Sequence, residues 1–308
     1  MMPVAVGPVV TAVVGRRFTT AHTRFGERAA DLEYARSLAA QAGVALRPDL
    51  TEKATGNSFE DMGAGLLAAL AGAREPSANE RTSSAQPAGE HSAAEPAPGE
   101  RPVDLLVLAH AAPDFAPTTL AAAAIAERIP GDPMVLGVTE QGRATPFTAL
   151  TLVRSHWRRH SHRRAMVMVF DQSFTPYANE VPDAWRVDGD AAVLLVLEAG
   201  PDDSTGSYRV RQEHGVSPEA AAGRLRALFA EADPDGSARV LAGSGVGTSW
   251  IPAGHGPVLR GPEGSPATGV LGLLPGLPPG DDAAPLLLVD YDRELGDLSL
   301  CRIETVRT

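Results

Sequence analysis

The apolar residues of this chain occur in short, nearly continuous runs that alternate with stretches of helical spacing. Runs such as VDLLVLAHA, MVLGV and AMVMVFD are typical of buried strands, whereas SFEDMGAGLLAALAGA and PFTALTLVRSHWRR have the periodicity of amphipathic helices. This alternation predicts an α/β protein with a mainly parallel sheet covered on both faces. The expected strands are 4–15, 103–111, 134–138, 165–171, 191–200, 208–216 and 238–246, with a hairpin over 286–304. The expected helices are 26–43, 58–73, 118–129, 146–159, 217–232 and 265–274.

The order of elements recurs in shorter form in the last third of the chain. We therefore predict two related halves, residues 1–205 and a reduced half over 206–308, which the hairpin closes with a turn near Glu294–Gly296. Residues 75–101 contain no Leu, Ile, Val, Phe, Tyr or Trp. Because this segment has nothing to bury, it is predicted to be a disordered insertion in the first half.

Composition narrows the function. The chain has 308 residues and a net charge of −11, which argues against a general nucleic-acid binder. The single cysteine, Cys301, rules out an internal disulfide and Cys-based metal sites, and it fits a reducing cytosol. No segment offers about 20 uninterrupted apolar residues, so no membrane span is predicted. We expect a cytoplasmic protein without a cofactor or a metal ion.

The stretch 134–152, MVLGVTEQGRATPFTALTL, joins an expected strand to an expected helix through a polar elbow. Many enzymes mount a nucleophile at such a turn, because the N–H groups of a helix N-terminus favour negative charge. This elbow carries Gly142 and Arg143 and has neither Cys nor Ser. Arg143 stays protonated at any relevant pH, so it cannot replace a nucleophile.

Three stretches together resemble the thiolase superfamily, and within it the ketoacyl synthase III-like condensing enzymes. They are the helix 58–73 with its following strand 103–111, the strand, elbow and helix of 134–152, and DGDAAVLLVLE at Asp188–Glu198. The resemblance implies a five-layered αβαβα fold of two related halves that dimerises through the first half. It also implies a catalytic Cys at the elbow, a His and an Asn or second His from the second half, and acyl transfer followed by decarboxylative condensation.

The sequence departs from this pattern at each catalytic position. Counting back from Ala149–Leu150 places Arg143 where the resemblance implies the Cys, and counting forward from the strand places Gly142 there. In the second half, the corresponding loops at 240–250 and 260–269 contain neither His nor Asn. The resemblance therefore implies a condensing-enzyme scaffold that lacks its nucleophile and its partners.

Other polar residues near the elbow are candidates for a remnant pocket or an interface. Each follows or ends an expected strand, where open α/β sheets bind ligands. They are His110, Glu140, Gln141, Thr145 and Asp171. Two weaker patterns are disfavoured. Ser155 would be a triad nucleophile in the middle of a helix, and GSGVGTSW lacks the spacing of a dinucleotide loop, so we expect it to be a structural turn.

A basic run, RSHWRRHSHRR at 154–164, ends the elbow helix. Cations at a helix C-terminus are favoured by the helix dipole, so a solvated helix end is one explanation. The alternative is a docking patch for an acidic acyl carrier protein or for the phosphate of its pantetheine arm. That patch would consist of Arg158, Arg159, Arg163 and Arg164.

Taken together, these features predict a non-catalytic ketosynthase III-like subunit. It would pair with an active condensing enzyme, or with a second copy of itself, and shape or stabilise an acyl pocket in fatty-acid or polyketide-type secondary metabolism. One alternative is an acyltransferase with non-Cys chemistry that uses Glu140, His110 or Asp171 as acid or base. Another is a carrier-protein binding module.

Overall fold

The computed structural model describes residues 7–21, 23–25, 29–50, 55–72, 101–178, 181–200, 208–255, 258–277 and 284–304. The predicted insertion lies outside these residues, apart from Arg101. The helices are α1 (Ala29–Ala42), α2 (Phe59–Gly72), α3 (Ala121–Ala126), α4 (Thr145–Arg159) and α5 (Pro218–Ala232). The short 3₁₀ turns are η1 (Gly142–Ala144), η2 (Asp183–Trp185), η3 (Thr248–Trp250) and η4 (Leu271–Gly276).

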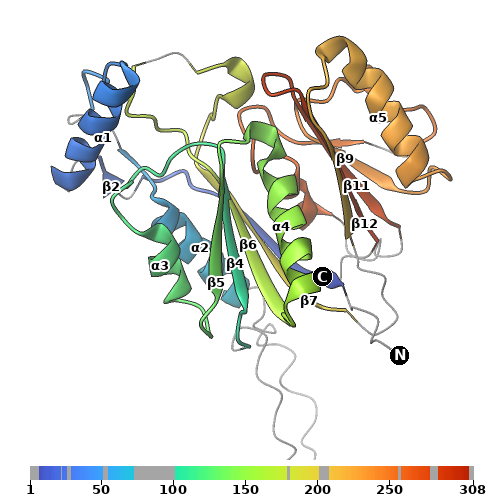
Figure 1. Cartoon of the computed structure of the whole chain (residues 1–308), viewed down its shortest axis with the longest axis horizontal. Helices are drawn as coiled ribbons and strands as arrows, with labels where there is room; N and C mark the ends of the chain where they lie inside the picture. The colour runs from blue at the N-terminus through green and yellow to red at the C-terminus, as the bar shows by residue number, and fades with distance from the viewer. Residues whose placement is uncertain are drawn as a thin grey trace, which may run out of the picture.

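The strands form two five-stranded sheets and a small ribbon (Figure 1). The first sheet has the order β5-β4-β6-β7-β1, and the second has the order β10-β9-β11-β12-β8. The first comprises β1 (Pro8–Arg17), β4 (Leu105–His110), β5 (Met134–Thr139), β6 (Arg164–Asp171) and β7 (Ala191–Ala199). The second comprises β8 (Tyr208–Glu213), β9 (Arg239–Ala242), β10 (Leu259–Arg260), β11 (Leu286–Asp292) and β12 (Asp297–Ile303). The ribbon pairs β2 (Thr23–Arg24) with β3 (Thr55–Gly56).

The two sheets have the same pattern of parallel and antiparallel strands. In the first, β5, β4 and β6 are parallel, and β7 and β1 each run antiparallel to their neighbours. In the second, β10, β9 and β11 are parallel, and β12 and β8 continue antiparallel. Each sheet is therefore mixed rather than mainly parallel, because β6–β7 and β11–β12 are consecutive strands joined without a crossover helix.

Alternation along the strands separates the layers. Val107 and Leu195 face a core that contains α4 and η4, whereas Leu106 and Leu194 face α2 and α3 on the opposite side of the first sheet. The second sheet packs on the same central core through Leu288 and on α5 through its other face. The layers are thus helix, sheet, helix, sheet, helix, the predicted αβαβα arrangement.

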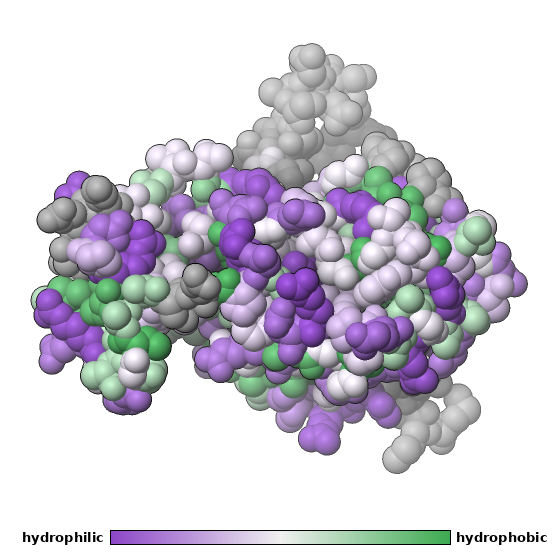
Figure 2. Space-filling model, turned by 90° about the horizontal axis from the view of Figure 1, so that it is seen from above, coloured by the Kyte–Doolittle hydropathy of each residue, from purple (hydrophilic) through white to green (hydrophobic). Residues whose placement is uncertain are grey.

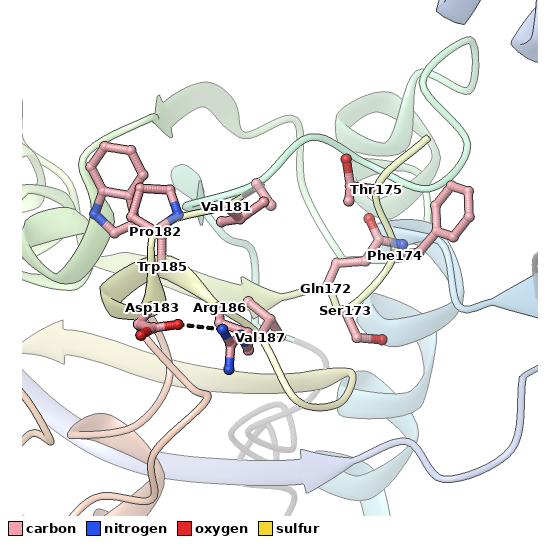
Figure 3. Close-up of a pocket in the computed structure, with 11 residues that line it drawn as sticks. Gln172, Ser173, Phe174, Thr175, Val181, Pro182, Asp183, Trp185, Arg186 and Val187 are labelled. Atoms are coloured by element: carbon pink, nitrogen blue, oxygen red, sulfur yellow. Dashed lines mark hydrogen bonds and ion pairs between the residues drawn. The ribbon is translucent and has the colours of Figure 1, made fainter. Parts of the chain in front are cut away.

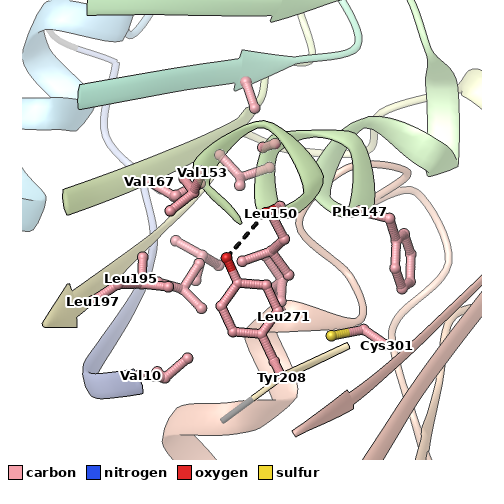
Figure 4. Close-up of a cluster of buried hydrophobic side chains, with 14 of the residues drawn as sticks. Val10, Phe147, Leu150, Val153, Val167, Leu195, Leu197, Tyr208, Leu271 and Cys301 are labelled. Carbon is pink, nitrogen blue, oxygen red and sulfur yellow. Dashed lines mark hydrogen bonds between the residues drawn. The ribbon is translucent and has the colours of Figure 1, made fainter. Parts of the chain in front are cut away.

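The central layer joins the two sheets into one core (Figure 4). Phe147, Leu150 and Val153 of α4 pack there with residues of both sheets. The hydroxyl of Tyr208, from β8, donates a hydrogen bond to the carbonyl of Leu150 at 3.0 Å. This hydrogen bond satisfies the buried hydroxyl and fixes which side of α4 faces the second sheet.

Local sequence signals explain several boundaries. The Ser58 hydroxyl accepts from the N–H of Asp61 at 3.1 Å, and the Asp61 carboxylate accepts from the N–H of Ser58 at 3.1 Å. This reciprocal capping box starts α2 as predicted. The turn of the β11–β12 hairpin also falls at the predicted place.

Two predicted helices are wrong in extent or type. The helix expected over 118–129 is only α3, Ala121–Ala126, and the one expected over 265–274 is the 3₁₀ turn η4. Pro275 lies inside η4, and proline cannot donate the hydrogen bonds that would extend a helix. No helix among the described residues is long and apolar enough to cross a membrane.

Candidate functional site

The elbow between β5 and α4 has an unusual backbone. Glu140 lies in the left-handed region at φ 61°, where residues other than glycine are uncommon, and Gly142 has φ 47°. A Cβ atom on Gly142 would lie 2.0 Å from Asp292 Oδ2, so glycine is required by space as well as by backbone angle. Position 142 therefore cannot hold any side chain.

Arg143 follows in η1 and turns inward to the central layer. Arg143 is only 7% exposed. The guanidinium donates to Ser244 Oγ at 2.7 Å and lies 3.7 Å from Asp290 Oδ2, and the backbone N–H of Arg143 donates to Asp292 Oδ2 at 3.0 Å. The elbow of the first half is thus bound to the β9 and β11 ends of the second half.

Asp292 connects three segments. Its Oδ2 also accepts from the indole N–H of Trp185 at 2.9 Å, and its Oδ1 accepts from the N–H groups of Glu294 and Leu295 at 3.0 and 3.1 Å. The side chain is fully buried. We call Arg143, Ser244, Asp290, Asp292 and Trp185 the Arg143 cluster.

Asp290 is the carboxylate that faces the guanidinium. It accepts from the N–H groups of Gly245 at 3.1 Å and Tyr291 at 2.9 Å. Burial raises the pKa of Asp290 to about 6, the charge of Arg143 opposes this shift, and Asp292 adds to it. A Cβ atom at Gly243 would lie 1.9 Å from Asp290 Oδ2, so the loop after β9 has no space for a larger side chain there.

Asp171, at the end of β6, points to the same central layer from the first sheet. It accepts from the N–H groups of Ala267 at 3.0 Å and Thr268 at 2.7 Å and from the Thr268 hydroxyl at 2.6 Å. Burial raises the pKa of Asp171, and these hydrogen bonds together with the charge of Arg143 oppose that shift. Its role in the structure is to hold the segment before η4 against the first sheet.

The predicted pocket residues do not all lie on one face of the sheet. His110 lies on the opposite face of the first sheet, with its ring 4.8 Å from the ring of Phe59, while Asp171 faces the central layer. Ser155 donates to the carbonyl of Thr151 within α4 at 2.9 Å, so no Ser155–His110–Asp171 triad forms. Thr145 is fully buried, and its hydroxyl has no hydrogen-bond partner among the described residues.

Glu140, with its exposed carboxylate, lines a cavity on the face of the sheet that His110 occupies. Burial lowers the pKa of His110, and the Ala112 carbonyl and Glu140 oppose that shift. Gln141, which precedes η1, is half-buried. The structure therefore divides the predicted set between two faces of one sheet.

A second, larger cavity of about 790 Å³ lies beside the loops that follow β6 (Figure 3). Gln172, Phe174 and Trp185 line it, and an ion pair between Asp183 and Arg186 lies at its edge. Trp185 thus connects this cavity to the Arg143 cluster through its hydrogen bond to Asp292.

The sequence did not predict a role for Trp185, Ser244, Asp290 or Asp292. The signal for the two aspartates was present in the run LLLVDYD, where polar residues replace every second position at the end of a buried strand. Alternation places those positions on one face, the face that packs on the central layer.

The basic run at the end of α4 is only partly exposed. Arg158, Arg159 and Arg163 are exposed, whereas the Arg164 side chain is 3% exposed and donates to the carbonyl of Arg101 at 3.0 Å. Arg164 therefore does not present its guanidinium to solvent. The nine α4 residues that precede the run, 145–153, separate it from the elbow by about 14 Å. No group of three His, Cys, Asp or Glu side chains suited to a metal ion occurs in the described part of the chain.

Two mixed five-stranded sheets of the same order, packed around a helical layer and covered by outer helices, define the thiolase-like αβαβα fold. No protein-family model and no curated protein matches the sequence. Solved structures of condensing enzymes match over nearly the whole chain. Because these structures are less than one fifth identical to this chain in sequence, the likeness establishes a shared fold alone.

One such structure is 3-oxoacyl-(acyl carrier protein) synthase III, FabH, from Pseudomonas aeruginosa PAO1, with 16% identity over 97% of this chain and 98% of that one, and a TM-score of 0.53. Another is the tetronic acid condensing enzyme AbyA1, with 17% identity, coverage of 96% and 99%, and a TM-score of 0.57. OleA from Xanthomonas campestris, with bound lauric acid and lauroyl-CoA, has 11% identity, coverage of 98% and 100%, and a TM-score of 0.57.

The Arg143 cluster yields a stability prediction. Replacing Arg143 with Met leaves Asp290 buried without its counter-ion, and we expect the free energy of unfolding at pH 7 to fall by about 3 to 5 kcal/mol. Urea unfolding measures this loss, with Arg158→Met, at an exposed arginine of the following helix α4, as the control. The double variant Arg143→Met/Asp290→Asn should recover part of the loss. Equal losses for Arg143→Met and Arg158→Met would contradict the assignment.

A second prediction concerns pH. The pKa of Asp290 in the folded protein, about 6, lies above the ordinary value of 3.8, so the folded state binds this proton more tightly than the unfolded chain. The contribution of Asp290 to the free energy of unfolding should therefore rise as the pH falls, by roughly 1 kcal/mol per unit between pH 6 and pH 4. Subtracting the profile of Asp290→Asn from that of the wild type isolates this group. A difference between the two profiles that does not change between pH 4 and pH 6 would refute this prediction.

Proposed function

We propose that the protein is a non-catalytic ketosynthase III-like subunit that pairs with an active condensing enzyme and shapes or stabilises its acyl pocket, in fatty-acid or polyketide-type metabolism. The observation that carries the proposal is the Arg143 cluster. At the elbow, a buried arginine is bound to a serine and an aspartate of the opposite half. A guanidinium there is permanently charged and has no lone pair with which to attack a thioester.

The second half supports the same conclusion. The loop after β9 consists of Gly243, Ser244 and Gly245, and a Cβ atom at Gly245 would lie 1.9 Å from the carbonyl oxygen of Tyr291. A His or Asn cannot be placed at these glycines unless β11 and Asp290 move. The space that a thioester would need between the elbow and this loop is occupied by paired charges.

The edge of the first sheet supports a role in pairing. Within the described part of the chain, β5 pairs with β4 alone, so its other edge is open. Met134 and Val135 on this strand are 41% and 37% exposed. An open strand edge with exposed apolar side chains is a ready surface for pairing with another chain. The resemblance to condensing enzymes likewise implies dimerisation through the first half.

The first test is acyl transfer. The purified chain is incubated with an acyl-CoA and a malonyl-loaded carrier protein, and mass spectrometry measures acylation of the protein and formation of a condensed product. We expect neither, and we expect Arg143→Cys to remain inactive in condensation, because a thiol alone does not supply the second-half residues. An active ketoacyl synthase III is the positive control. Acyl transfer by the wild-type chain alone would overturn the proposal and favour the acyltransferase alternative.

The second test is pairing. The chain is co-expressed with a ketoacyl synthase III from the same organism, and native mass spectrometry measures the complexes. We expect a heterodimer that Val135→Asp prevents, because a charge on the edge strand disfavours strand pairing. Leu295→Asp, at a turn residue with the same 37% exposure, is the matched control and should leave the complex intact. A stable homodimer that excludes the synthase would contradict the heterodimer.

A further inference from the structure

A cavity of about 500 Å³ lies on the outer face of the first sheet, between α1, the start of α3 and the open edge strand β5. Leu38, Phe59 and Leu108 contribute to its apolar wall. Figure 2 views the molecule from above, with the lobe that contains α1 at the left and apolar side chains on it beside polar ones. The cavity therefore adjoins the strand edge that the proposed pairing uses.

The edge at β5 differs from the other sheet edges in having no protection against pairing. Proteins protect exposed edges with charged side chains, bulges or very short strands. In the described part of the chain, the other edge strands are β1, β8 and β10. A bulge interrupts β1 between Val10 and Ala12, β10 has only two residues, and β8 carries the exposed Arg209 and Arg211. By contrast, β5 has six residues, MVLGVT, none of which is charged, and it pairs with β4 without a register shift.

Gly137 leaves a gap in the row of side chains where the cavity meets this edge. The register with β4 pairs Val135 with Leu106 and Gly137 with Leu108, and both leucines pack on the outer face. Alternation therefore directs Val135, Gly137 and Thr139 to that face. A Cβ atom on Gly137 would meet no atom within 4 Å, and its φ lies outside the left-handed region. The backbone angle does not require glycine here, so its effect is to leave space.

A strand added at β5 would place every second side chain over this gap. The residue directly opposite Gly137 would have its Cβ about 4.5 to 5.5 Å away across the pair. In recognition by strand addition, main-chain hydrogen bonds supply affinity, and pockets for alternate side chains supply specificity. Because Gly137 lines the cavity together with Leu38 and Phe59, an apolar side chain at the opposite position would extend over the glycine onto an apolar wall.

We propose that the cavity receives one large apolar side chain, a Leu, Met or Phe, from the edge strand of the condensing enzyme that pairs at β5. The inference rests on the proposed pairing and specifies what the partner's strand must present. A second copy of this chain, paired antiparallel about a twofold axis perpendicular to the sheet, would present the same Val135, Gly137 and Thr139 on this face. None of these is a large apolar side chain, so that strand would leave the cavity largely empty. The cavity therefore favours a heterodimer over a homodimer, because an unfilled apolar space forfeits packing.

The first measurement fills the gap from within the chain. Gly137→Ile raises the strand propensity of β5, so backbone pairing alone would be maintained or strengthened. If a partner side chain enters the cavity, the same change displaces it. The chain is co-expressed with a ketoacyl synthase III from the same organism, and native mass spectrometry measures the ratio of heterodimer to free subunits. We expect Gly137→Ile to lower this ratio at least about tenfold. Gly223→Ile, at an exposed α5 position whose Cβ also meets nothing within 4 Å, should leave it unchanged.

The second measurement reports on the cavity wall. The single cysteine of the chain, Cys301, is fully buried, so an introduced thiol is the accessible one. Leu38→Cys places a thiol on the wall that α1 contributes, and Ser37→Cys places one at the exposed neighbouring position of the same helix. Pairing with the synthase should slow alkylation of Leu38→Cys by a maleimide at least about tenfold, because the partner side chain covers that wall. Alkylation of Ser37→Cys should not change.

The outcomes separate this inference from the proposed function. If the wild-type chain forms no heterodimer, the proposed function fails and the inference fails with it. If Gly137→Ile forms as much heterodimer as the wild type, or if pairing leaves alkylation of Leu38→Cys unchanged, the cavity is not the receptor although pairing stands. A homodimer that protects Leu38→Cys as well as the synthase does would make a second copy the occupant and overturn the inference. Circular dichroism and thermal unfolding establish that each variant is folded, and if Leu38→Cys unfolds, Gly137→Ile decides the question.

Discussion

The burial of the Arg143 guanidinium is the constraint on which the centre of this molecule depends. A cation removed from water is tolerated only where counter-charges and hydrogen-bond acceptors surround it. Here Ser244 accepts a hydrogen bond from the guanidinium and Asp290 forms an ion pair with it, and Asp292 accepts a hydrogen bond from the backbone N–H of Arg143. The glycines at 142, 243 and 245 follow from this arrangement, because a side chain on any of them would collide with these carboxylates or with the β11 backbone.

The cluster also explains why the two halves pack in one relative orientation. Apolar packing of α4 between the sheets supplies most of the favourable burial, but it is not directional. The directional contacts lie at the strand ends. Asp292 binds the elbow and Trp185 of the first half, and Asp171 of the first half binds the segment at Ala267 and Thr268 of the second. These reciprocal carboxylate contacts fix how the second sheet sits on α4.

Much of this architecture follows from the sequence because its strands are nearly continuous apolar runs. The strand–elbow–helix unit and the recurrence of elements in the second half could be predicted from pattern alone. The short helices could not be predicted in this way. The apolar residues of η4 have helical spacing, but they pack in the core from a 3₁₀ turn. The candidate site was predicted less well. His110 and Asp171 end neighbouring strands, but their side chains leave opposite faces of the sheet, and only the register of β4 against β6 determines this.

A filled centre and an open cavity lie on opposite faces of the first sheet. Along β4 and β5, alternate side chains enter two environments that differ in charge balance. Toward the central layer, the carboxylates face an internal cation and backbone N–H groups. Toward the outer face, the His110 ring lies 4.8 Å from the ring of Phe59, and Asp114 accepts hydrogen bonds from the N–H groups of Phe59 and Ala116. The central layer is therefore held by charged and hydrogen-bonded contacts in addition to apolar packing, whereas the packing of α2 and α3 on the outer face of the same strands is mainly apolar.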